Sequence, residues 1–315
     1  MNRRVAILGG RGYAGAEFLG LLCGHPDLEL AAAFSSSQAG QRLDSVATGW
    51  RGSGQTFDQL TDSAVDKVQA DAWLLALPNG VAAQWVQRIE ANDPAAVIID
   101  LSADYRFNGD WVYGLPELNR TAIPTARRIA NPGCYATGAQ LALSPLLGQL
   151  AETPVVFAVS GYSGAGRTPN ERNDPDRLRD NLLPYSLAGH LHEKEISHQL
   201  QSRVSFMPHV AAFFRGIGLT VHVRLNDPVT AAELLRLYQD AYAGEALLDV
   251  SPEIPEIQQV AGTAGVRIGG FTVDPRDPHS VVLVACLDNL LKGAASQAMQ
   301  NMNLALGLDE LTGIQ

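Results

Sequence analysis

The sequence predicts an α/β protein in which a domain with a parallel sheet is combined with an α+β domain whose sheet is mainly antiparallel. Three observations lead to this fold class. The first third of the chain alternates short apolar runs with helical stretches, the pattern of a parallel α/β sheet. A glycine-rich turn follows the first apolar run. Residues 219–225 alternate apolar and polar side chains with period two, which is typical of an antiparallel strand with one wet face.

The elements expected in the first domain follow from apolar runs bounded by turn residues. We expect strands at residues 4–8, 28–34, 72–77, 96–101 and 127–130. A helix is expected at about residues 13–24, because His25-Pro26 ends it, and another through Trp85 and Ile89. Since helices alternate with strands, the sheet is expected to be parallel.

Beyond residue 150 the pattern of the sequence changes. Residues 154–160 form an expected strand that runs into a glycine-rich loop at residues 161–167, and a polar, proline-rich excursion follows at residues 168–186. Further strands are expected at residues 219–225, 266–273 and 280–287, and an amphipathic helix at residues 289–306. We therefore expect a nucleotide-binding domain at residues 1–145 and 288–315, and a substrate domain at residues 146–287.

The composition excludes several classes of protein. The 315 residues carry 33 acidic and 23 basic side chains, a formal charge of −10, whereas a nucleic-acid partner requires a basic surface. No apolar run approaches the roughly 18 residues of a membrane span, and the run at residues 5–9 is too short for a signal peptide. The three cysteines are odd in number and widely spaced, which implies no disulfide framework. We expect a soluble, cytoplasmic protein with neither a nucleic-acid nor a membrane partner.

The first glycine-rich turn has the residues of a dinucleotide-binding loop. It follows the first strand, opens the first helix and consists of Gly9, Gly10, Arg11, Gly12, Tyr13, Ala14 and Gly15. Glycines let the backbone approach a pyrophosphate, whose charge is favoured at a helix N-terminus. The first domain is therefore predicted to be of the Rossmann type, with these residues at the cofactor, although a tight turn without a ligand has the same pattern.

The end of the second strand distinguishes between the two nicotinamide cofactors. An NAD site usually places Asp or Glu there, about 20 residues past the glycines, to hold the ribose 2′-hydroxyl. This chain has Ser35, Ser36 and Ser37 at that position, with Arg42 nearby. Hydroxyls and a guanidinium suit a 2′-phosphate, so we expect NADP, although Asp44 could fold back toward this site.

Cys134 is the candidate nucleophile. The turn at residues 131–133 follows an apolar strand, so Cys134 begins a helix, whose dipole favours thiolate over thiol. The carboxyl edge of a parallel sheet is also where such folds bind ligands. Cys23, inside the first helix, and Cys286, inside an apolar strand, are interpreted as buried hydrophobic residues. A thiolate beside a nicotinamide suggests acyl chemistry, in which a thioester accepts a hydride.

These residues resemble those of a known family. The segment Ile129-Ala130-Asn131-Pro132-Gly133-Cys134-Tyr135-Ala136-Thr137-Gly138, followed by Leu143 and Pro145, is similar to the active-site signature of the N-acetyl-γ-glutamyl-phosphate reductases. Further similar segments occur in the family's order along nearly the whole chain, at residues 12–17, 100–106, 113–117, 160–167, 208–209 and 288–295. The related aspartate-semialdehyde dehydrogenases share the architecture but typically have Asn where this chain has Gly133.

The resemblance implies NADPH-dependent reduction of N-acetyl-L-glutamyl 5-phosphate to N-acetyl-L-glutamate 5-semialdehyde and phosphate, in arginine biosynthesis. It also implies a homodimer or homotetramer, with residues 146–287 as the substrate and oligomerisation domain. The chain departs from the family in two places. Residues 190–196 lack the Arg and the Pro that the family has in this segment, and Phe214 stands where a Pro is common.

The implied chemistry needs a group that activates the thiol and later moves a proton at the thiohemiacetal oxygen. Histidine suits this role because it titrates near neutral pH. His190, His192 and His209 are the candidates, since the other four histidines occupy positions typical of a helix end, a strand face, a turn and a helix surface. The resemblance points to His190 and His192, of which we choose His192. No CxxC or HExxH spacing supports a metal site, so no metal is expected.

The implied substrate carries a carboxylate and an acyl phosphate, so arginines are expected to face it. The candidate substrate-binding residues are Arg106, Ser160, Gly161, Arg167 and Arg215. The expected cofactor set is completed by Pro78 after the third strand, Gly164 in the second glycine-rich loop and Asn289 at the start of the last helix.

The sequence is also consistent with two other functions. One is a sister semialdehyde dehydrogenase acting on another acyl phosphate, such as aspartyl phosphate. The other is a non-catalytic NADP-binding sensor that keeps the fold. Turnover of N-acetylglutamate semialdehyde with NADP and phosphate separates the three functions.

Overall fold

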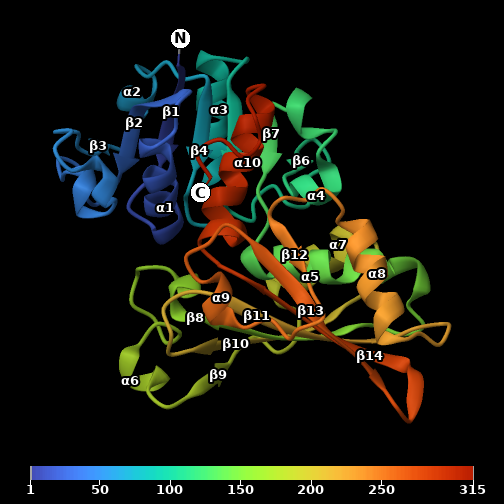
Figure 1. Ribbon diagram of the computed structural model, residues 1–315. Helices are drawn as coiled ribbons and strands as arrows, with labels where there is room; N and C mark the ends of the chain where they lie inside the picture. The colour runs from blue at the N-terminus through green and yellow to red at the C-terminus, as the bar shows by residue number, and fades with distance from the viewer. Residues whose placement is uncertain (1, 315) are drawn as a thin grey trace. The chain divides into compact units, whose positions relative to one another are not determined.

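The computed structural model describes residues 2–314, which fold into two compact units (Figure 1). Unit 1 consists of the chain up to Gly133 together with the stretch from Ala294 onward, and unit 2 is Cys134–Gly293. Each unit has its own sheet and its own buried core.

The division differs from the expected boundaries at 145/146 and 287/288, because the helix that begins at Cys134 belongs to unit 2. Its packing gives the reason. A Cβ on Gly138 would lie 2.6 Å from the side chain of Leu219 and 2.7 Å from that of Leu287. The helix therefore rests closely on the sheet of unit 2 at a position where only glycine fits.

Unit 1 is built on a seven-stranded parallel sheet in the order β3-β2-β1-β4-β5-β7-β6. Its strands are β1 (Arg3–Leu8), β2 (Leu28–Ser35), β3 (Asp58–Gln59), β4 (Ala72–Leu75), β5 (Val97–Asp100), β6 (Val112–Tyr113) and β7 (Arg128–Ala130). Every residue of β4 and β5 is buried, as expected for strands covered on both faces. The predicted parallel α/β architecture is confirmed, and the short edge strands β3 and β6 add to the expected strands.

Helices complete unit 1. They are α1 (Tyr13–Cys23), α2 (Asp62–Val65), α3 (Ala82–Asn92), α4 (Pro116–Asn119) and α10 (Ser296–Ala305), with the turns η1 (Leu43–Ser45), η2 (Thr48–Trp50) and η3 (Ile123–Thr125). Trp85 and Ile89 of α3 pack with Trp73 into one apolar cluster. The last helix, α10, contacts α1 and β5, so the end of the chain returns to the first unit. It is not amphipathic as expected, because residues 296–303 are buried on all sides.

Unit 2 is built on a seven-stranded sheet in the order β12-β13-β14-β11-β8-β10-β9. Its strands are β8 (Val155–Gly161), β9 (Leu182–Pro184), β10 (Ser205–Ala211), β11 (Ile217–Arg224), β12 (Leu248–Val250), β13 (Val266–Asp274) and β14 (Asp277–Leu287). The pairs β8–β10 and β12–β13 are parallel and the other pairs are antiparallel. The prediction of a mainly antiparallel sheet is confirmed.

Strand β10 was not expected, although it is one of the inner strands of this sheet. It contains Pro208, which has no backbone N–H and is unusual within a sheet. The neighbouring β8 lies in parallel register with it and pairs Ala158 with Pro208. The edge beyond β10 is lined by the short strand β9. Pairing with β8, which is distant in sequence, therefore makes this segment a strand although Pro208 disfavours a strand locally.

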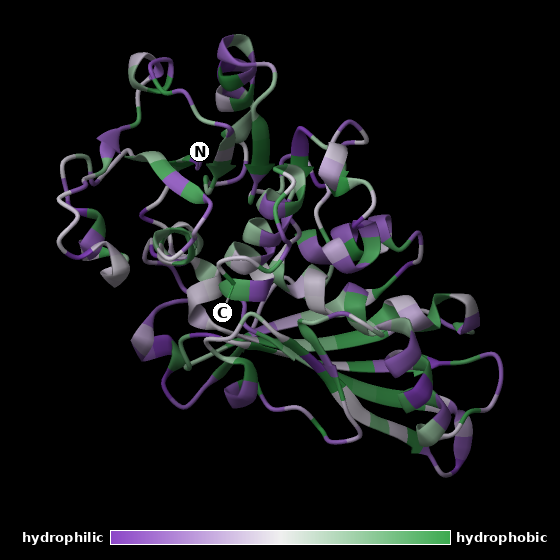
Figure 2. Cartoon of the chain, turned by 45° about the horizontal axis from the view of Figure 1, so that its top comes forward, coloured by the Kyte–Doolittle hydropathy of each residue, from purple (hydrophilic) through white to green (hydrophobic). Residues whose placement is uncertain are grey.

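The helices of unit 2 are α5 (Cys134–Leu143), α6 (Pro175–Leu178), α7 (Leu191–Gln199), α8 (Ala231–Ala241) and α9 (Ile257–Val260), with the turns η4 (Ser144–Gln149), η5 (Tyr162–Ala165) and η6 (Leu291–Ala295). Helix α5 packs on the face of the sheet that carries Leu219 and Leu287. The opposite face exposes apolar side chains of neighbouring strands, including Phe157 and Met207. The strands of unit 2 are largely hydrophobic in Figure 2.

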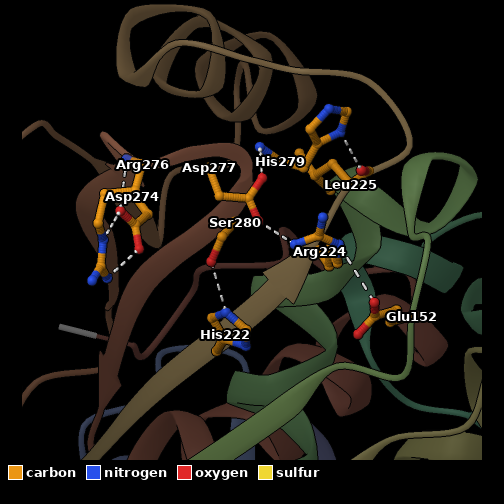
Figure 3. Close-up of polar contacts among 9 residues, drawn as sticks. All are labelled: Glu152, His222, Arg224, Leu225, Asp274, Arg276, Asp277, His279 and Ser280. Atoms are coloured by element: carbon orange, nitrogen blue, oxygen red, sulfur yellow. Dashed lines mark hydrogen bonds and ion pairs between the residues drawn. The ribbon is translucent and has the colours of Figure 1, made fainter.

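The hairpin between β13 and β14 is fixed to β11 by polar contacts (Figure 3). Arg224 of β11 forms ion pairs with Asp277 and with Glu152. His279 contacts the carbonyl oxygen of Leu225 at 3.0 Å, and His222 contacts the hydroxyl of Ser280 at 3.0 Å. These contacts hold the far end of the two longest strands and lie away from the residues of the candidate site.

Asp100, the last residue of β5, is a fully buried carboxyl group at the carboxyl edge of the unit 1 sheet. It accepts hydrogen bonds from the amide of Ser102 at 3.0 Å and from its hydroxyl at 2.6 Å. Burial raises the pKa of Asp100 to about 6, and the bonds from Ser102 oppose the shift only in part. In the folded state this carboxyl therefore keeps its proton at pH values where the unfolded chain has lost it.

Because the folded pKa lies above the unfolded value, Asp100 destabilises the fold as pH rises from about 4 to 6, and the cost persists above pH 6. Asp100→Asn removes this dependence. We expect the free energy of unfolding of the variant, relative to the natural protein, to increase by about 1–3 kcal/mol between pH 4 and pH 8, at 1.36 kcal/mol per pKa unit. Urea unfolding at both pH values measures it. A difference that stays constant with pH contradicts the prediction.

Candidate active site

The glycine-rich loop of unit 1 joins β1 to α1, and its glycines have distinct roles. Gly9 has φ +85°, and a Cβ there would lie 2.2 Å from the carbonyl oxygen of Ala76, while a Cβ on Gly15 would lie 2.8 Å from that of Gly9. These two glycines are required by packing. At Gly12 the nearest atom to a Cβ is 3.6 Å away, and no side chain caps the start of α1. The loop therefore leaves room for a pyrophosphate to approach the backbone at Gly12 and the N-terminus of α1.

The serines expected to bind the cofactor ribose lie at the end of β2. The hydroxyl of Ser35 is buried and accepts hydrogen bonds from the amides of Ser37 and Gln38, which turns the chain there. Ser36 and Ser37 are exposed. The guanidinium of Arg42 forms a bidentate ion pair with Asp44, at 2.7 Å from Nη2 and 3.1 Å from Nε. The carboxylate of Asp44 thus balances the charge of Arg42.

Arg106 was expected to face the substrate, and the structure shows bonds of a different kind. Its side chain is buried and donates hydrogen bonds to the carbonyl oxygens of Asn131 at 2.9 Å and Leu101 at 2.7 Å. These bonds connect the loops that leave β5 and β7. They hold in place the Asn131-Pro132-Gly133 turn immediately before Cys134.

Cys134 is the first residue of α5, as the sequence predicts, and its side chain is partly exposed. The backbone of Gly293 packs directly against it, since a Cβ on Gly293 would lie 2.6 Å from Cys134 Cβ and 3.2 Å from its Cα. Gly293 belongs to the π-helical turn Leu291–Ala295, and such turns are frequent at functional sites. The position of the thiol is therefore set by this turn as well as by α5.

The other two cysteines differ from Cys134 and from each other. Cys286 is buried in β14, and burial raises the pKa of its thiol to about 12. Cys23 was expected to be buried, but it is exposed, and its thiol donates a hydrogen bond to the carbonyl oxygen of Gly49 at 3.1 Å. The expectation was wrong for Cys23 because it sits at the last turn of α1, on the side of the helix away from the core.

The carboxylate of Asp288 organises the π-helical turn. It is fully buried and accepts hydrogen bonds from the amides of Leu290 at 2.8 Å, Leu291 at 3.0 Å and Gly262 at 2.6 Å. Arg215 donates to it through Nε at 2.6 Å and Nη2 at 3.2 Å. Arg215, expected to face the substrate, thus has its charge balanced by Asp288.

Asn289 fastens the second glycine-rich loop. Its side chain accepts a hydrogen bond from the amide of Gly216 at 2.7 Å and donates one to the hydroxyl of Ser163 at 2.9 Å. A Cβ on Gly161 would lie 2.5 Å from the carbonyl oxygen of Phe214, so this loop is pressed against residues 213–216. The remaining site candidates of this segment are Ser160, which is buried, and Gly164 and Arg167, which are exposed.

Tyr135 connects α5 to the histidine pair. Its hydroxyl donates a hydrogen bond to the backbone carbonyl of His209 at 2.7 Å. Its ring lies 6.4 Å from the ring of His190 and 5.8 Å from that of His192, and the two imidazoles are 5.0 Å apart, all between ring centroids. Tyr185 lies 5.5 Å from His190. Sequence reasoning missed both tyrosines, although Tyr135 adjoins Cys134 and could have been found.

His190 caps the helix that carries His192. His190 is the N-cap of α7, where its Nδ1 accepts a hydrogen bond from the amide of His192 at 3.1 Å. Burial lowers the pKa of His190 to about 4, with the positive charge of Arg172 acting in the same direction and Glu193 opposing it. His190 is therefore neutral at pH 7, with its proton on Nε2.

Glu193 ties the first turn of α7 to β10, because its carboxylate accepts hydrogen bonds from the amides of Gly189 at 3.0 Å and Phe206 at 3.2 Å. His209, the third candidate, lies in β10, and its ring packs at a tilt against Phe157, with 4.4 Å between centroids. Phe157 belongs to the face of the sheet opposite to α5. The structure thus gathers Tyr135, His190 and His192 and places the imidazole of His209 elsewhere.

Within residues 2–314, no group of three His, Cys, Asp or Glu side chains is placed to hold a metal ion. No helix in this part of the chain has the length and apolarity needed to cross a membrane.

Comparisons with known proteins agree with this geometry. Residues 4–126 match the semialdehyde dehydrogenase NAD-binding domain, and residues 134–289 match the semialdehyde dehydrogenase dimerisation domain. The chain is 52% identical over 310 residues to the N-acetyl-gamma-glutamyl-phosphate reductase of Xanthomonas campestris pv. campestris, covering 98% of each. It is also 52% identical to the protein of that name from Stenotrophomonas maltophilia, covering 98% of this chain and 97% of the relative.

Solved structures share the fold at lower sequence identity. Aspartate semialdehyde dehydrogenase II from Vibrio cholerae superimposes with a TM-score of 0.77 at 20% identity, covering 98% of this chain and 99% of that one. A probable aspartate-semialdehyde dehydrogenase from Pseudomonas aeruginosa gives a TM-score of 0.76 at 20% identity, covering 97% and 99%. At this level of identity the likeness concerns the fold.

The contact between Gly293 and Cys134 generates a testable prediction. Gly293→Ala places a methyl group 2.6 Å from Cys134 Cβ, which is too close, so the thiol must move. We expect turnover to fall at least about 10²-fold, because misplacement by about 1 Å costs that much. The matched control is Gly148→Ala in the same unit, where a Cβ meets nothing within 4 Å. Steady-state kinetics of both variants, with thermal unfolding to show that each is folded, tests the contact. Normal turnover of Gly293→Ala rules it out.

Proposed function

The chain belongs to the family of the N-acetyl-gamma-glutamyl-phosphate reductases, and we propose that it reduces N-acetyl-L-glutamyl 5-phosphate to N-acetyl-L-glutamate 5-semialdehyde and phosphate, with NADPH, in arginine biosynthesis. The observation that carries the proposal is the cysteine at the start of α5, one residue from a tyrosine that contacts two histidines. The aspartyl phosphate reaction and the sensor function are not favoured, since the relatives that match end to end bear the name of this reductase.

Cys134 is the nucleophile. The N-terminus of α5 favours its thiolate, and its partial exposure lets a substrate reach it. The thiolate sulfur bonds to the acyl carbon of the substrate, the carbon–oxygen bond to the phosphate breaks, and phosphate leaves with the electron pair. The product of this step is a thioester on Cys134. Cys286 is excluded from this role by burial, which keeps its thiol protonated.

A bound nicotinamide supplies the hydride that reduces the thioester. The chain must then stabilise the oxyanion of the resulting thiohemiacetal and return the sulfur as a leaving group. Backbone amides at the start of α5, or a protonated His192, supply the hydrogen bonds to the oxyanion. Collapse of the thiohemiacetal releases the aldehyde and restores the thiolate.

His192 moves the proton in this scheme. His190 is less suited, because its pKa of about 4 keeps it neutral and its Nδ1 is engaged by the amide of His192. His190 acts as a positioning residue that fixes the first turn of α7. The bonds of Glu193 to Gly189 and Phe206 support the same turn from β10.

Unit 1 holds the cofactor, which we propose to be NADP. The backbone around Gly12 and the uncapped start of α1 receive the pyrophosphate, with Pro78 after β4 at the same edge of the sheet. The exposed hydroxyls of Ser36 and Ser37 are positioned after β2 for the 2′-phosphate. Arg42 joins them when its ion pair with Asp44 opens. Gly164 and Asn289 remain candidates for the nicotinamide from the sequence.

We also propose that two copies of the chain associate through the exposed face of the unit 2 sheet. Phe157 and Met207 are 38% and 39% exposed and are paired across adjacent strands, with Val284 in the same row beyond Thr220. Such an apolar sheet face is normally covered by another surface. Residues 134–289 match a domain named for dimerisation. Sedimentation equilibrium that shows the mass of a single chain overturns this proposal.

The catalytic roles are tested by two substitutions. Cys134→Ser should lose nearly all turnover while still binding NADPH, because the hydroxyl of serine is a far weaker nucleophile at neutral pH. His192→Ala should lower the rate about 10²–10⁴-fold, the usual range for a general acid–base. Cys23→Ser and His198→Ala, on exposed positions, serve as matched controls.

The assay follows NADPH formation from N-acetylglutamate semialdehyde with NADP and phosphate. Near-normal turnover in His192→Ala transfers the proton role to His190, since the imidazole of His209 lies on the other face of the sheet. Turnover that does not depend on phosphate rejects acyl phosphate chemistry, and a preference for aspartate semialdehyde supports the sister enzyme. If neither aldehyde is turned over, the sensor function remains.

The cofactor proposal is tested at Ser36. Ser36→Asp places a carboxylate where the 2′-phosphate is expected, so kcat/KM for NADP should fall about 10–100-fold, the value of one charge-assisted hydrogen bond of about 1.5–3 kcal/mol. The kcat/KM for NAD should not fall. Ser53→Asp adds the same charge at another exposed position of unit 1 and should change neither value. The proposal is contradicted if kcat/KM of the natural protein for NAD equals or exceeds its kcat/KM for NADP.

A further inference from the structure

The polar excursion between β8 and β9 carries a cleft next to the histidine cluster. The cleft has a volume of about 400 Å³ and is lined by Arg172, Arg177, Tyr185 and Ser186, among other residues of the excursion. It lies wholly within unit 2. The sequence predicted none of these residues as site residues, because their segment has the local pattern of a loop.

Arg172 is held against the tyrosine of the cluster. Its guanidinium carbon lies 4.9 Å from the ring centroid of Tyr185, a cation–π contact that orients the guanidinium plane. Tyr185 in turn contacts the ring of His190 at 5.5 Å. The charge of Arg172 contributes to the lowered pKa of His190, which shows that the guanidinium acts on the cluster.

The loop around Arg172 is held in one conformation by side-chain bonds. The amide of Arg172 donates a hydrogen bond to Asn170 Oδ1 at 3.0 Å. The side chain of Asn173 donates to the carbonyl oxygens of Gly166 at 2.8 Å and Thr168 at 2.9 Å. The guanidinium is therefore presented by an ordered segment, which lowers the entropy lost when a ligand binds.

Arg172 differs from the other cations of the excursion in its charge balance. Arg177 forms an ion pair with Glu171 at 2.7 Å, and Arg179 forms one with Asp176 at 2.7 Å. Within residues 2–314, Arg172 has no carboxylate at ion-pairing distance. The positive charge of Arg172 is thus oriented by Tyr185 and lies next to the histidine cluster. It is available to an anionic ligand.

We propose that Arg172 binds the carboxylate of the substrate, at the far end of the carbon chain from the reacting carbonyl. The inference rests on the proposed function, since that substrate carries one carboxylate and one acyl phosphate. The phosphate leaves from the carbon that Cys134 attacks and must lie against the thiol. Arg172 contacts Tyr185, and Tyr185 interacts with Tyr135, the residue next to Cys134, so two tyrosines separate the guanidinium from the cysteine. That spacing fits the distant carboxylate.

This assignment also explains why the guanidinium stacks on a tyrosine. The face of Tyr185 fixes the plane of the guanidinium, and a fixed plane can bind a carboxylate in the bidentate mode. Lysine has the same charge but lacks this geometry. Arg172 would therefore be a specificity-determining residue that selects acyl chains ending in a carboxylate.

The test compares Arg172→Gln, which removes the charge, with Arg177→Gln from the same cleft as the matched control. The substrates are N-acetylglutamate 5-semialdehyde and its uncharged 1-methyl ester, each with NADP and phosphate. In Arg172→Gln we expect KM for the free acid to rise about 10–100-fold. The kcat should change only a few-fold, and KM for phosphate and KM for NADP should be unchanged. The preference of the natural protein for the free acid over the ester should disappear, and Arg172→Lys should restore it in part.

Other results overturn the proposal. If KM for phosphate rises instead, the guanidinium serves the leaving group, and if the preference for the free acid survives, Arg172 does not bind the carboxylate. Failure of the proposed function is distinguishable, because the natural protein would then turn over neither aldehyde. In that case calorimetric titration with N-acetyl-L-glutamate and its 1-methyl ester decides. If Arg172→Gln binds the free acid as tightly as the natural protein does, the proposal is overturned.

Discussion

The ion pair between Arg215 and the buried carboxylate of Asp288 is the interaction on which the arrangement of the candidate site depends. A fully buried charge is tolerated only when it is paired and hydrogen-bonded, and Asp288 has three backbone donors besides Arg215. Two of those donors begin the turn that places Gly293 against Cys134. The next residue, Asn289, fastens the second glycine-rich loop. Loss of the ion pair would leave an uncompensated charge and release both the turn that carries Gly293 and the second glycine-rich loop.

Local signals in the sequence were sufficient for the parts of the site that depend on backbone geometry. The glycines before α1 and the turn before α5 act within a few residues, so the loop and the helix start at Cys134 could be predicted. The arginines could not be placed in the same way. Arg215 and Arg106 were recognised by their chemistry, but their partners lie 73 and 25 positions away in the chain. A single sequence carries no measure of such contacts.

The same limit applies to the sheet of unit 2. Strand β10 contains a proline and was missed, and with it the alternation that sets the imidazole of His209 on the face of Phe157. The expected domain boundary at 145/146 differs from the division at Gly133/Cys134 for a related reason. Whether a helix belongs to the domain before or after it depends on what it packs against, and Gly138 packs on Leu219 and Leu287. Element type was predictable here, whereas the partner of each element was not.

The charges around the cysteine are arranged so that binding and proton transfer do not interfere. A thiolate and an anionic substrate repel each other, so the site needs positive charge. An imidazolium would supply it only while it keeps its proton, and it would then be unable to accept one. Guanidinium groups stay charged at all physiological pH values. Arg172 can therefore attract the substrate while it helps to keep His190 neutral. In the proposed mechanism proton transfer is left to His192, whose backbone amide donates a hydrogen bond to the uncharged ring of His190.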